Sequence, residues 1–332
     1  MKHLINELKE ITQVPGISGY EDRVREKLIE WIEPFADYHV DRIGNLVVEL
    51  GEGEEEMLFM AHMDEIGLLI TGITKDGKLK FRKIGGIDDR LLLGRHVDVI
   101  TSGGVLDGVI GVTPVHLNLQ RKFETVPWHD LEIDIGAENR EEALELVKPL
   151  DFAVFKKHFG ILNGKYITTR SLDDRFGIVA LFEAIKDLVD HELGGKIIFA
   201  FTVQEEIGLK GARFLAEHYS PKYAIAVDSF ACCSFLTGDV HPGGGALIRA
   251  VDNSAVYTHS LGRKVWKIAE RNAIPIQIGV TGGGTDASVF QHKSDILALS
   301  VPIKYLHSEV EMLHLGDLSN LIKLIQALAF EL

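Results

Sequence analysis

The fold class is decided by the stretch Lys196-Ile-Ile-Phe-Ala-Phe-Thr-Val-Gln-Glu-Glu-Ile-Gly208. Residues 197–203 form an apolar run, which is typical of a buried parallel strand. Glu205 and Glu206 follow that run directly. Open α/β sheets bind ligands just beyond the carboxyl ends of their strands. On this stretch alone, the two glutamates are either solvated loop charges or part of a site, in which one holds a metal and the other carries a proton.

The composition is that of an ordinary globular chain, with 46% hydrophobic and 25% charged residues among 332. Lysine and arginine together number 35 against 49 aspartates and glutamates, which gives a formal net charge of −14. Nucleic acids and anionic membranes are bound by clustered positive charge, so this balance argues against both as partners.

Three further features favour a cytoplasmic location. The only cysteines are the neighbours Cys232 and Cys233, which are too few for the disulfide framework of a secreted protein. The first ten residues lack the apolar core of a signal peptide. No apolar run approaches the ~20 residues that are needed to cross a bilayer. We therefore expect a cytoplasmic protein.

The hydrophobic periodicity divides the chain into an α/β domain and a β-rich insertion. Residues 67–160 contain short β-rich runs punctuated by glycine, a pattern typical of a small barrel or sandwich. On either side of this segment, apolar strands alternate with helical patterns. We therefore expect a mixed-sheet α/β/α domain made of residues 1–66 and 161–332, interrupted by a domain of residues 67–160. The insertion has the size of an independent module.

Within the α/β part, capping signals and periodicity locate the main elements. The pattern from Ser18 to Glu21 resembles a capping box and predicts the start of a helix that runs to Ile32. Other helices are predicted at 3–13, 173–189, 209–218, 258–271, 285–291 and from 317 onward, and strands at 46–50, 57–61, 197–203, 223–228, 275–280 and 295–300.

Acidic and imidazole side chains gather after these strands. His62 and Asp64 follow strand 57–61 at positions i and i+2, so both point to the same side. A histidine that binds a metal commonly donates its other ring N–H to a carboxylate. His62 as a ligand with Asp64 as its partner fits this arrangement, and a surface histidine beside a surface aspartate is the alternative.

Three further side chains complete a candidate metal site. Asp173 lies at the start of helix 173–189. Helix capping is the simpler explanation for an acidic residue at this position. Asp228 ends strand 223–228, and His307 follows an apolar run. Such nitrogen and oxygen ligands suit Zn²⁺, Co²⁺ or Mn²⁺. If one carboxylate bridges, five ligands suit two ions ~3.5–4 Å apart. The five candidate ligands are His62, Asp173, Glu206, Asp228 and His307.

Several motifs in the same order resemble the M42 family of co-catalytic metallo-aminopeptidases, which includes the tetrahedral (TET) and glutamyl aminopeptidases. The resemblance extends over nearly the whole chain. The segments that carry it are 61–67, 104–112, 171–175, 204–208, 227–228, 282–287 and 305–308.

The resemblance implies a role for each residue of the candidate site. His62, Asp173 and Asp228 would surround one metal, and Asp173, Glu206 and His307 the other, with Asp173 bridging. Asp64 would orient His62, and Glu205 would be the general base. The family's cofactors are two divalent cations per subunit, which we expect to be Zn²⁺, with Co²⁺ as the alternative. The bond between Asp173 and Asp174 is expected to be a cis peptide.

The resemblance also implies peptide substrates and a homo-oligomer. Residues 67–160 correspond to the family's dimerisation domain, and the dimers would assemble into a tetrahedral dodecamer. We expect hydrolysis of the N-terminal residue, with a preference for acidic first residues, and neutral or broad specificity is the alternative. A glycoside hydrolase is a less favoured class, because adjacent glutamates do not flank a bond as its two carboxyls must.

Five residues are candidates for substrate binding. The glycine-rich run from Gly282 lacks the lysine of a phosphate-binding loop and is interpreted as a tight turn that shapes the site. Arg249 and Lys304 follow site segments and would meet an acidic side chain, or else pair with internal acids. The five candidates are Gly283, Gly284, Thr285, Arg249 and Lys304.

Overall fold

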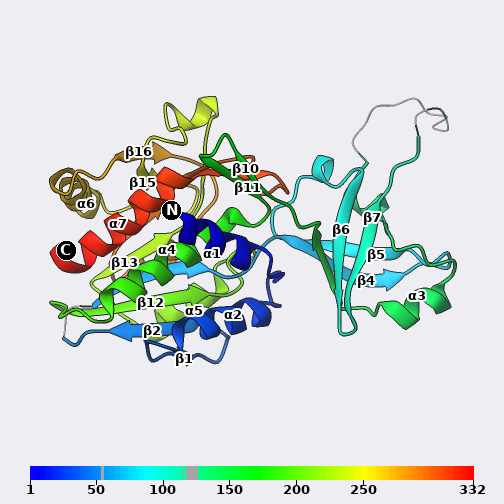
Figure 1. Cartoon of the computed structure of the whole chain (residues 1–332), viewed down its shortest axis with the longest axis horizontal. Coiled ribbons are helices and arrows are strands. Elements are labelled where there is room, and N and C mark those ends of the chain that lie inside the picture. The colour runs from blue at the N-terminus through cyan, green and yellow to red at the C-terminus, as the bar shows by residue number, and fades with distance from the viewer. Residues whose placement is uncertain (54–55, 115, 117–125) are drawn as a thin grey trace.

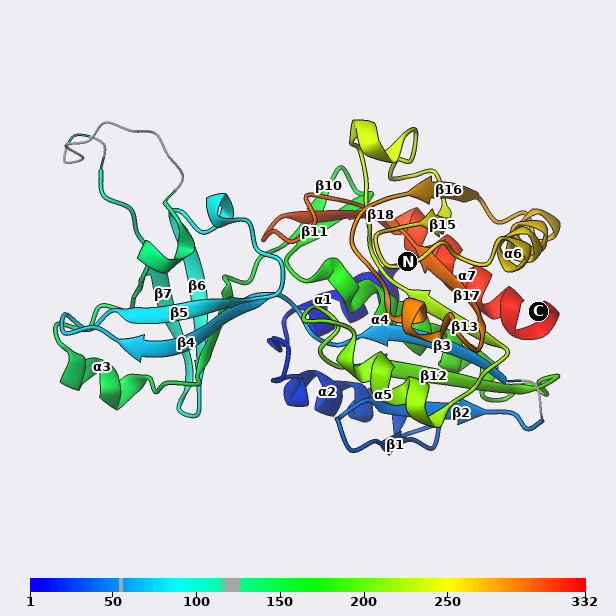
Figure 2. The same ribbon diagram turned by 180° about the vertical axis from the view of Figure 1, so that it is seen from behind.

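The computed structural model describes residues 1–53, 56–114, 116 and 126–332. These residues form an eight-stranded sheet, a five-stranded sheet and a closed six-stranded barrel. The barrel lies beside the part that contains both sheets, as Figures 1 and 2 show from opposite sides. The predicted α/β fold with a small barrel-like domain is therefore confirmed.

The eight-stranded sheet is mixed, and its central strands are parallel. Strand β3 pairs in parallel with β12 on one side and β13 on the other, and β13 pairs in parallel with β17. The spatial order is β1 (His39–Val40), β2 (Leu46–Leu50), β12 (Lys196–Thr202), β3 (Glu56–His62), β13 (Tyr223–Val227), β17 (Asp295–Ser300), β15 (Ala246–Val251) and β16 (Ile276–Val280).

The register of the central strands brings their carboxyl ends to one edge. Thr202 of β12 lies opposite His62 of β3, and Ala226 of β13 lies opposite Met60. Residues that follow these three strands therefore meet at the same place. This is the edge at which the sequence predicts a site.

Helices cover both faces of this sheet. In Figures 1 and 2, α1, α4 and α7 lie on one face and α5 on the other. The helices of this part are α1 (Lys2–Thr12), α2 (Asp22–Ile32), α4 (Leu172–Leu188), α5 (Lys210–His218), α6 (His259–Arg271) and α7 (Leu315–Glu331). No helix among the described residues is long and apolar enough to cross a membrane.

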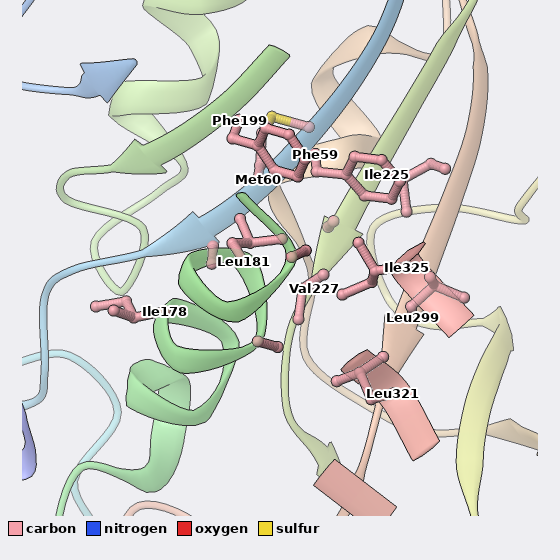
Figure 3. Packing of buried hydrophobic residues seen from close by; sticks show 14 of the residues in the cluster. Phe59, Met60, Ile178, Leu181, Phe199, Ile225, Val227, Leu299, Leu321 and Ile325 are labelled. Atoms are coloured by element: carbon pink, nitrogen blue, oxygen red, sulfur yellow. The ribbon is translucent and has the colours of Figure 1, made fainter. Parts of the chain in front are cut away.

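The main core lies between the sheet and these helices. Phe59 of β3 and Phe199 of β12 stack with ring centroids 5.5 Å apart. Leu181 of α4 and Ile325 of α7 contribute to the same cluster, which Figure 3 shows at close range. A fully buried side chain of this size stabilises the fold by about 1.5–3 kcal/mol. The helices thereby hold the strand ends in fixed positions.

A second sheet, which the sequence did not predict, lies next to the first. Its strand order is β10 (Phe159–Leu162), β11 (Tyr166–Thr169), β19 (Glu311–His314), β18 (Pro302–Lys304) and β14 (Phe230–Ala231). Strand β11 leads into α4, and the chain between β18 and β19 contains His307. This sheet therefore carries two of the candidate ligands towards the edge of the first.

The barrel has an apolar interior of its own. Leu79, Val97 and Ile133 are fully buried within it. Its strands are β4 (Gly67–Ile73), β5 (Leu79–Ile84), β8 (Ile133–Asp134), β7 (Gly104–Ile110), β6 (Arg95–Thr101) and β9 (Phe152–Phe155), and α3 (Arg140–Leu146) lies beside them. All six strands fall within the predicted insertion. The residue bounds of the two domains stay a prediction.

The capping box predicted for the second helix is wrong. Helix α2 begins at Asp22, and its N-terminus has no side-chain cap. The Ser18 hydroxyl instead donates to Asp64, 2.6 Å away, and the Glu21 carboxylate accepts hydrogen bonds from the backbone N–H groups of Gly19 and Gln204. Both side chains are used in tertiary contacts beside the candidate site, which a local sequence pattern does not reveal.

Candidate metal centre

Five candidate ligands converge from two sheets. His62 is the last residue of β3, Glu206 follows β12, and Asp228 comes directly after β13. Asp173 lies in the first turn of α4, and His307 lies between β18 and β19. The parallel strand ends thus supply three ligands, and the second sheet positions the other two.

Asp173 stands between the two histidines. Its Oδ1 lies 3.2 Å from His62 Nε2, and its Oδ2 lies 3.4 Å from His307 Nε2. Glu206 Oε1 is 3.2 Å from the same His307 nitrogen. His62, Asp173 and Glu206 each offer one ligand atom, and these three atoms lie within 4.8 Å of one another, close enough to hold a metal ion.

The hydrogen bonds of both histidines leave the same nitrogen for a ligand. His62 Nδ1 is 3.0 Å from the backbone oxygen of Asp64, and His307 Nδ1 is 2.9 Å from that of Gly86. A carbonyl oxygen only accepts, so each Nδ1 donates; each Nε2 then faces a carboxylate, and a bound cation would take the place of its proton. Both Nε2 atoms face the carboxylates, as metal ligands would.

Asp64 connects His62 with the two glutamates. Its buried carboxylate accepts hydrogen bonds from the backbone N–H groups of Glu205, at 2.9 Å, and Glu206, at 3.1 Å. Its Oδ1 is 3.5 Å from His62 Nδ1, so the closer partner of that ring nitrogen is the Asp64 carbonyl. Asp64 therefore positions the backbone of the glutamates as well as the imidazole.

A pocket of about 340 Å³ opens over this cluster. Four carboxylates and His307 line it, and no lysine does so among the described residues. Arg249 is the one arginine in that lining. The four carboxylates are Asp173, Glu205, Glu206 and Asp228.

The crowding of carboxyl groups appears in their pKa values. Burial raises the pKa of Glu205 well above its ordinary value and raises the pKa of Asp228 to about 7. Burial also opposes ionisation of Asp173, but hydrogen bonds with the two histidines outweigh it and lower its pKa. Despite burial, Glu206 and Asp173 raise the pKa of His307 to about 12. Carboxyl groups that retain protons and an imidazole that stays charged beside them fit a site in which bound cations would take the place of these protons.

Further buried groups, which were not among the predicted site residues, support the ligands. The Glu311 carboxylate accepts from the backbone N–H groups of Asp173, at 3.1 Å, and His307, at 2.8 Å. The Ser229 hydroxyl donates to Asp173 Oδ2 at 2.9 Å. Asp174 accepts from the backbone N–H of His62 at 3.2 Å. Asp174 lies in segment 171–175, which carries the family resemblance, whereas no motif marks Ser229 or Glu311.

The local backbone at the site is unusual. Ser171, Gln204, Tyr305 and His307 all have positive φ, near +55° to +60°, where residues other than glycine are uncommon. The bond between Asp173 and Asp174 is a cis peptide, as the resemblance predicts. The chain therefore bends sharply just before or at several candidate site residues.

The predicted substrate-binding residues do not all lie in the pocket. Gly283 and Gly284 line it together with Arg249. Thr285 is fully buried, and its hydroxyl contacts Tyr257 at 2.7 Å. Lys304 is not part of the lining.

Arg249 is occupied by internal partners. Its Nη1 donates to Asp252 at 3.0 Å, and its Nη2 donates to the backbone oxygen of Ser229. The side chain is only 3% exposed. The sequence left open whether Arg249 binds substrate or pairs with internal acids, and the contact with Asp252 fits the second alternative.

Sequence comparison connects this geometry with known peptidases. The model of the family described as M42 glutamyl aminopeptidase matches residues 44–324. The lysyl aminopeptidase of Pyrococcus furiosus is 34% identical, over 98% of this chain and 96% of its own. The glutamyl aminopeptidase of Lactococcus lactis is 27% identical, over 95% and 92% of the two chains.

Solved structures show the same fold at higher identity. The TET1 peptidase of Pyrococcus horikoshii, which can assemble into a tetrahedron or a large octahedral shell, is 74% identical. It superposes with a TM-score of 0.97 over 99% of this chain and all of its own. A second structure, PhTET1-12s, is a dodecamer with 74% identity and a TM-score of 0.96, and 99% of each chain is covered.

Proposed function

The chain belongs to the M42 family of aminopeptidases, and from this premise we propose that it hydrolyses the N-terminal residue of peptides with two metal ions. The cations would be held by His62, Asp173 and Asp228 on one side and by Asp173, Glu206 and His307 on the other. Zn²⁺ is the proposed ion and Co²⁺ the alternative, because both accept imidazole and carboxylate ligands.

One observation carries the proposal of two ions. The two oxygens of Asp173 face different histidines, His62 and His307, at 3.2 and 3.4 Å. A carboxylate whose two oxygens face different histidines is placed to bridge two cations ~3.5–4 Å apart. Glu206 is next to His307, and Asp228 lines the same pocket on the other side of the cluster.

The chain's own groups supply the proton transfer. When bound, the cations would polarise the scissile carbonyl and lower the pKa of a water molecule at the site. Glu205 lines the pocket and is positioned by its backbone N–H bond to Asp64, so it can accept a proton and pass it to the leaving amine. The environment that raises the pKa of Glu205 suits this role.

The charge of the pocket supports exopeptidase action. Glu205, Glu206 and Asp228 line a cavity of about 340 Å³, and the one arginine among its described lining residues, Arg249, is already paired. The free α-amino group of a peptide is positive and is attracted to such a cavity. The middle of a peptide chain offers no such charge.

A preference for acidic first residues is the narrower part of the proposal. It rests on Arg249 and Lys304. The Arg249 guanidinium is bound by Asp252 and the Ser229 carbonyl, and Lys304 lies outside the pocket lining, so attraction by Lys304 would act from beyond the lining. Neutral or broad specificity is the alternative, and the relatives include both a lysyl and a glutamyl aminopeptidase.

Assembly is proposed on the likeness to TET1. We propose that residues 67–160 form the dimer contact and that dimers assemble into a closed dodecamer, as PhTET1-12s does. In support, β7 of the barrel exposes Val105 and Val109, with exposed fractions of 50% and 39%. Exposed apolar side chains on one strand are typical of an interface.

The test is hydrolysis of aminoacyl chromogenic substrates before and after metal removal. Chelation and dialysis should abolish hydrolysis, and added Zn²⁺ or Co²⁺ should restore it. A matched N-acetylated substrate is the control and should not be cleaved. Full hydrolysis by a verified metal-free preparation would overturn the proposal.

Specificity is tested with the same assay. Substrates that begin with glutamate, leucine and lysine should rank in that order by kcat/KM. A Lys304→Met variant should reduce kcat/KM for the glutamyl substrate and leave the leucyl substrate unchanged. If the lysyl substrate ranks first, the acidic preference is wrong while the aminopeptidase proposal stands.

A further inference from the structure

A short turn far out on the α/β part exposes two large apolar side chains. Phe235 and Leu236 lie in the 3-10 helix η4 (Phe235–Thr237) and are 99% and 83% exposed. We call this pair the knob. Single exposed apolar residues are ordinary, but two neighbours so fully exposed on one turn indicate a surface that another molecule covers. The turn is the yellow-green loop that projects at the top of Figures 1 and 2.

The turn is held in shape by its own hydrogen bonds. The Ser234 hydroxyl accepts from the Leu236 N–H at 3.3 Å, and the Thr237 hydroxyl accepts from the Ser234 N–H at 3.1 Å. The Thr237 hydroxyl also donates to the Ser234 carbonyl at 2.9 Å. These hydrogen bonds hold the backbone of the turn, so less backbone ordering is needed when the knob binds.

A groove that could receive the knob lies on the same chain. It has a volume of about 590 Å³, runs between α6 and strands β15 and β16, and is lined by Trp266, Val256 and Ile278. Val256 is 76% exposed and Ile278 is 54% exposed. Strand β16 is the last strand of its sheet, so nothing among the described residues pairs with its outer side.

Charge favours a contact between the knob and the groove. The exposed residues Arg263, Lys267 and Glu270 of α6 line the groove and leave it with a net positive charge. The only carboxylate in the segment 232–240, which carries the knob, is Asp239. In a chain with a net charge of −14, a second copy approaches most easily where its acidic surface meets a basic one.

Symmetry then identifies the partner. A closed shell made of two-fold dimers needs a second contact that joins one dimer to the next, and that contact brings two different surfaces together. The barrel would supply only the first contact. This step rests on the shell assembly proposed above. We propose that the knob of one copy enters the groove of another and forms the contact that joins dimers.

The experiment is to break each half of the contact separately. Phe235→Lys places a charge on the knob, and Val256→Lys places one in the groove. Molar mass in solution is measured by light scattering coupled to size exclusion. The wild-type chain should have the mass of a dodecamer or a larger shell, and both variants should have the mass of a dimer.

The matched control is Phe330→Lys, on a 51% exposed phenylalanine that does not line the groove. It should keep the wild-type mass. Hydrolysis per chain of a small aminoacyl substrate should be unchanged in all three variants, because none of the substituted residues lines the catalytic pocket. That assay reports on the proposed activity independently of mass.

Four results would overturn the contact. They are a wild-type chain no larger than a dimer, a full-size assembly in both variants, dissociation of only one of them, and dissociation of the Phe330→Lys control. An inactive wild-type chain that still shows the predicted masses would contradict the proposed activity and leave the contact standing.

Discussion

The carboxyl edge of the main sheet and the interior of the barrel bury opposite kinds of side chain. At the sheet edge, Asp64, Asp174 and Glu311 are at most 2% exposed, and Asp173 is 6% exposed. Inside the barrel, the buried cluster is apolar throughout. The single acidic residue buried among the described part of the barrel is Asp98, which pairs with Lys156 at 3.2 Å.

This difference separates chemistry from scaffolding. Burying a carboxylate without a matching charge costs several kcal/mol, so a fold that gathers many at one place needs a compensating cation. The barrel carries no such cost and contributes stability through apolar burial. We therefore expect substitutions at the sheet edge to act on metal binding and turnover, and substitutions in the barrel to act on stability.

The largest effect is expected from Asp173→Ala. Loss of a bridging carboxylate should release both cations, each of which contributes several kcal/mol to the reaction, so activity should fall by roughly 10⁴-fold or more. Metal content is measured by mass spectrometry after dialysis. Asp107→Ala is the matched control, because it removes an exposed barrel carboxylate. A variant that keeps two ions per chain would show that Asp173 is no bridge.

A smaller effect is expected from Glu311→Gln. The Glu311 carboxylate accepts from the backbone N–H groups of Asp173 and His307. Loss of a group that hydrogen bonds to metal ligands typically lowers metal affinity by roughly 10–100-fold. Metal titration of the apoprotein measures the change. An affinity equal to that of the wild-type chain would restrict Glu311 to a structural role.

The sheet edge and the barrel are compared most directly by making the same substitution, isoleucine to alanine, in each of them. Ile225 of β13 and Ile133 of β8 are both fully buried, so each change to alanine should lower the free energy of unfolding by about 2–5 kcal/mol. Only Ile225→Ala should also weaken metal binding, because β13 ends next to Asp228. Denaturant unfolding and metal titration provide the two readouts. Equal loss of metal affinity in both variants would contradict the separation.

Much of the site could be predicted because it lies at one sheet edge. Apolar runs locate β3, β12 and β13, and His62, Glu206 and Asp228 lie at or shortly after the ends of these strands. Parallel pairing then brings these residues together. For Asp173 and His307, the sequence indicates only a helix start and the end of an apolar run, and their pairing depends on the resemblance to a family.

The remainder depends on contacts between distant segments. Glu311 accepts from a residue 138 positions away. Ser18, which the sequence predicts to cap a helix, donates instead to Asp64, 46 positions away. The positive φ values at Gln204 and His307 occur without glycine, so no turn signal marks them. Such features are set by tertiary packing, which overrides local propensity.

The central claim is that neighbouring glutamates have different roles, and Glu205→Gln tests it most directly. The measurement is metal content together with kcat on one aminoacyl substrate. Removing a general base should lower kcat by roughly 10²–10⁴-fold. The variant should keep two ions per chain, because Glu206 and the other ligands are untouched. Loss of metal from Glu205→Gln, with turnover restored by excess metal, would contradict the account.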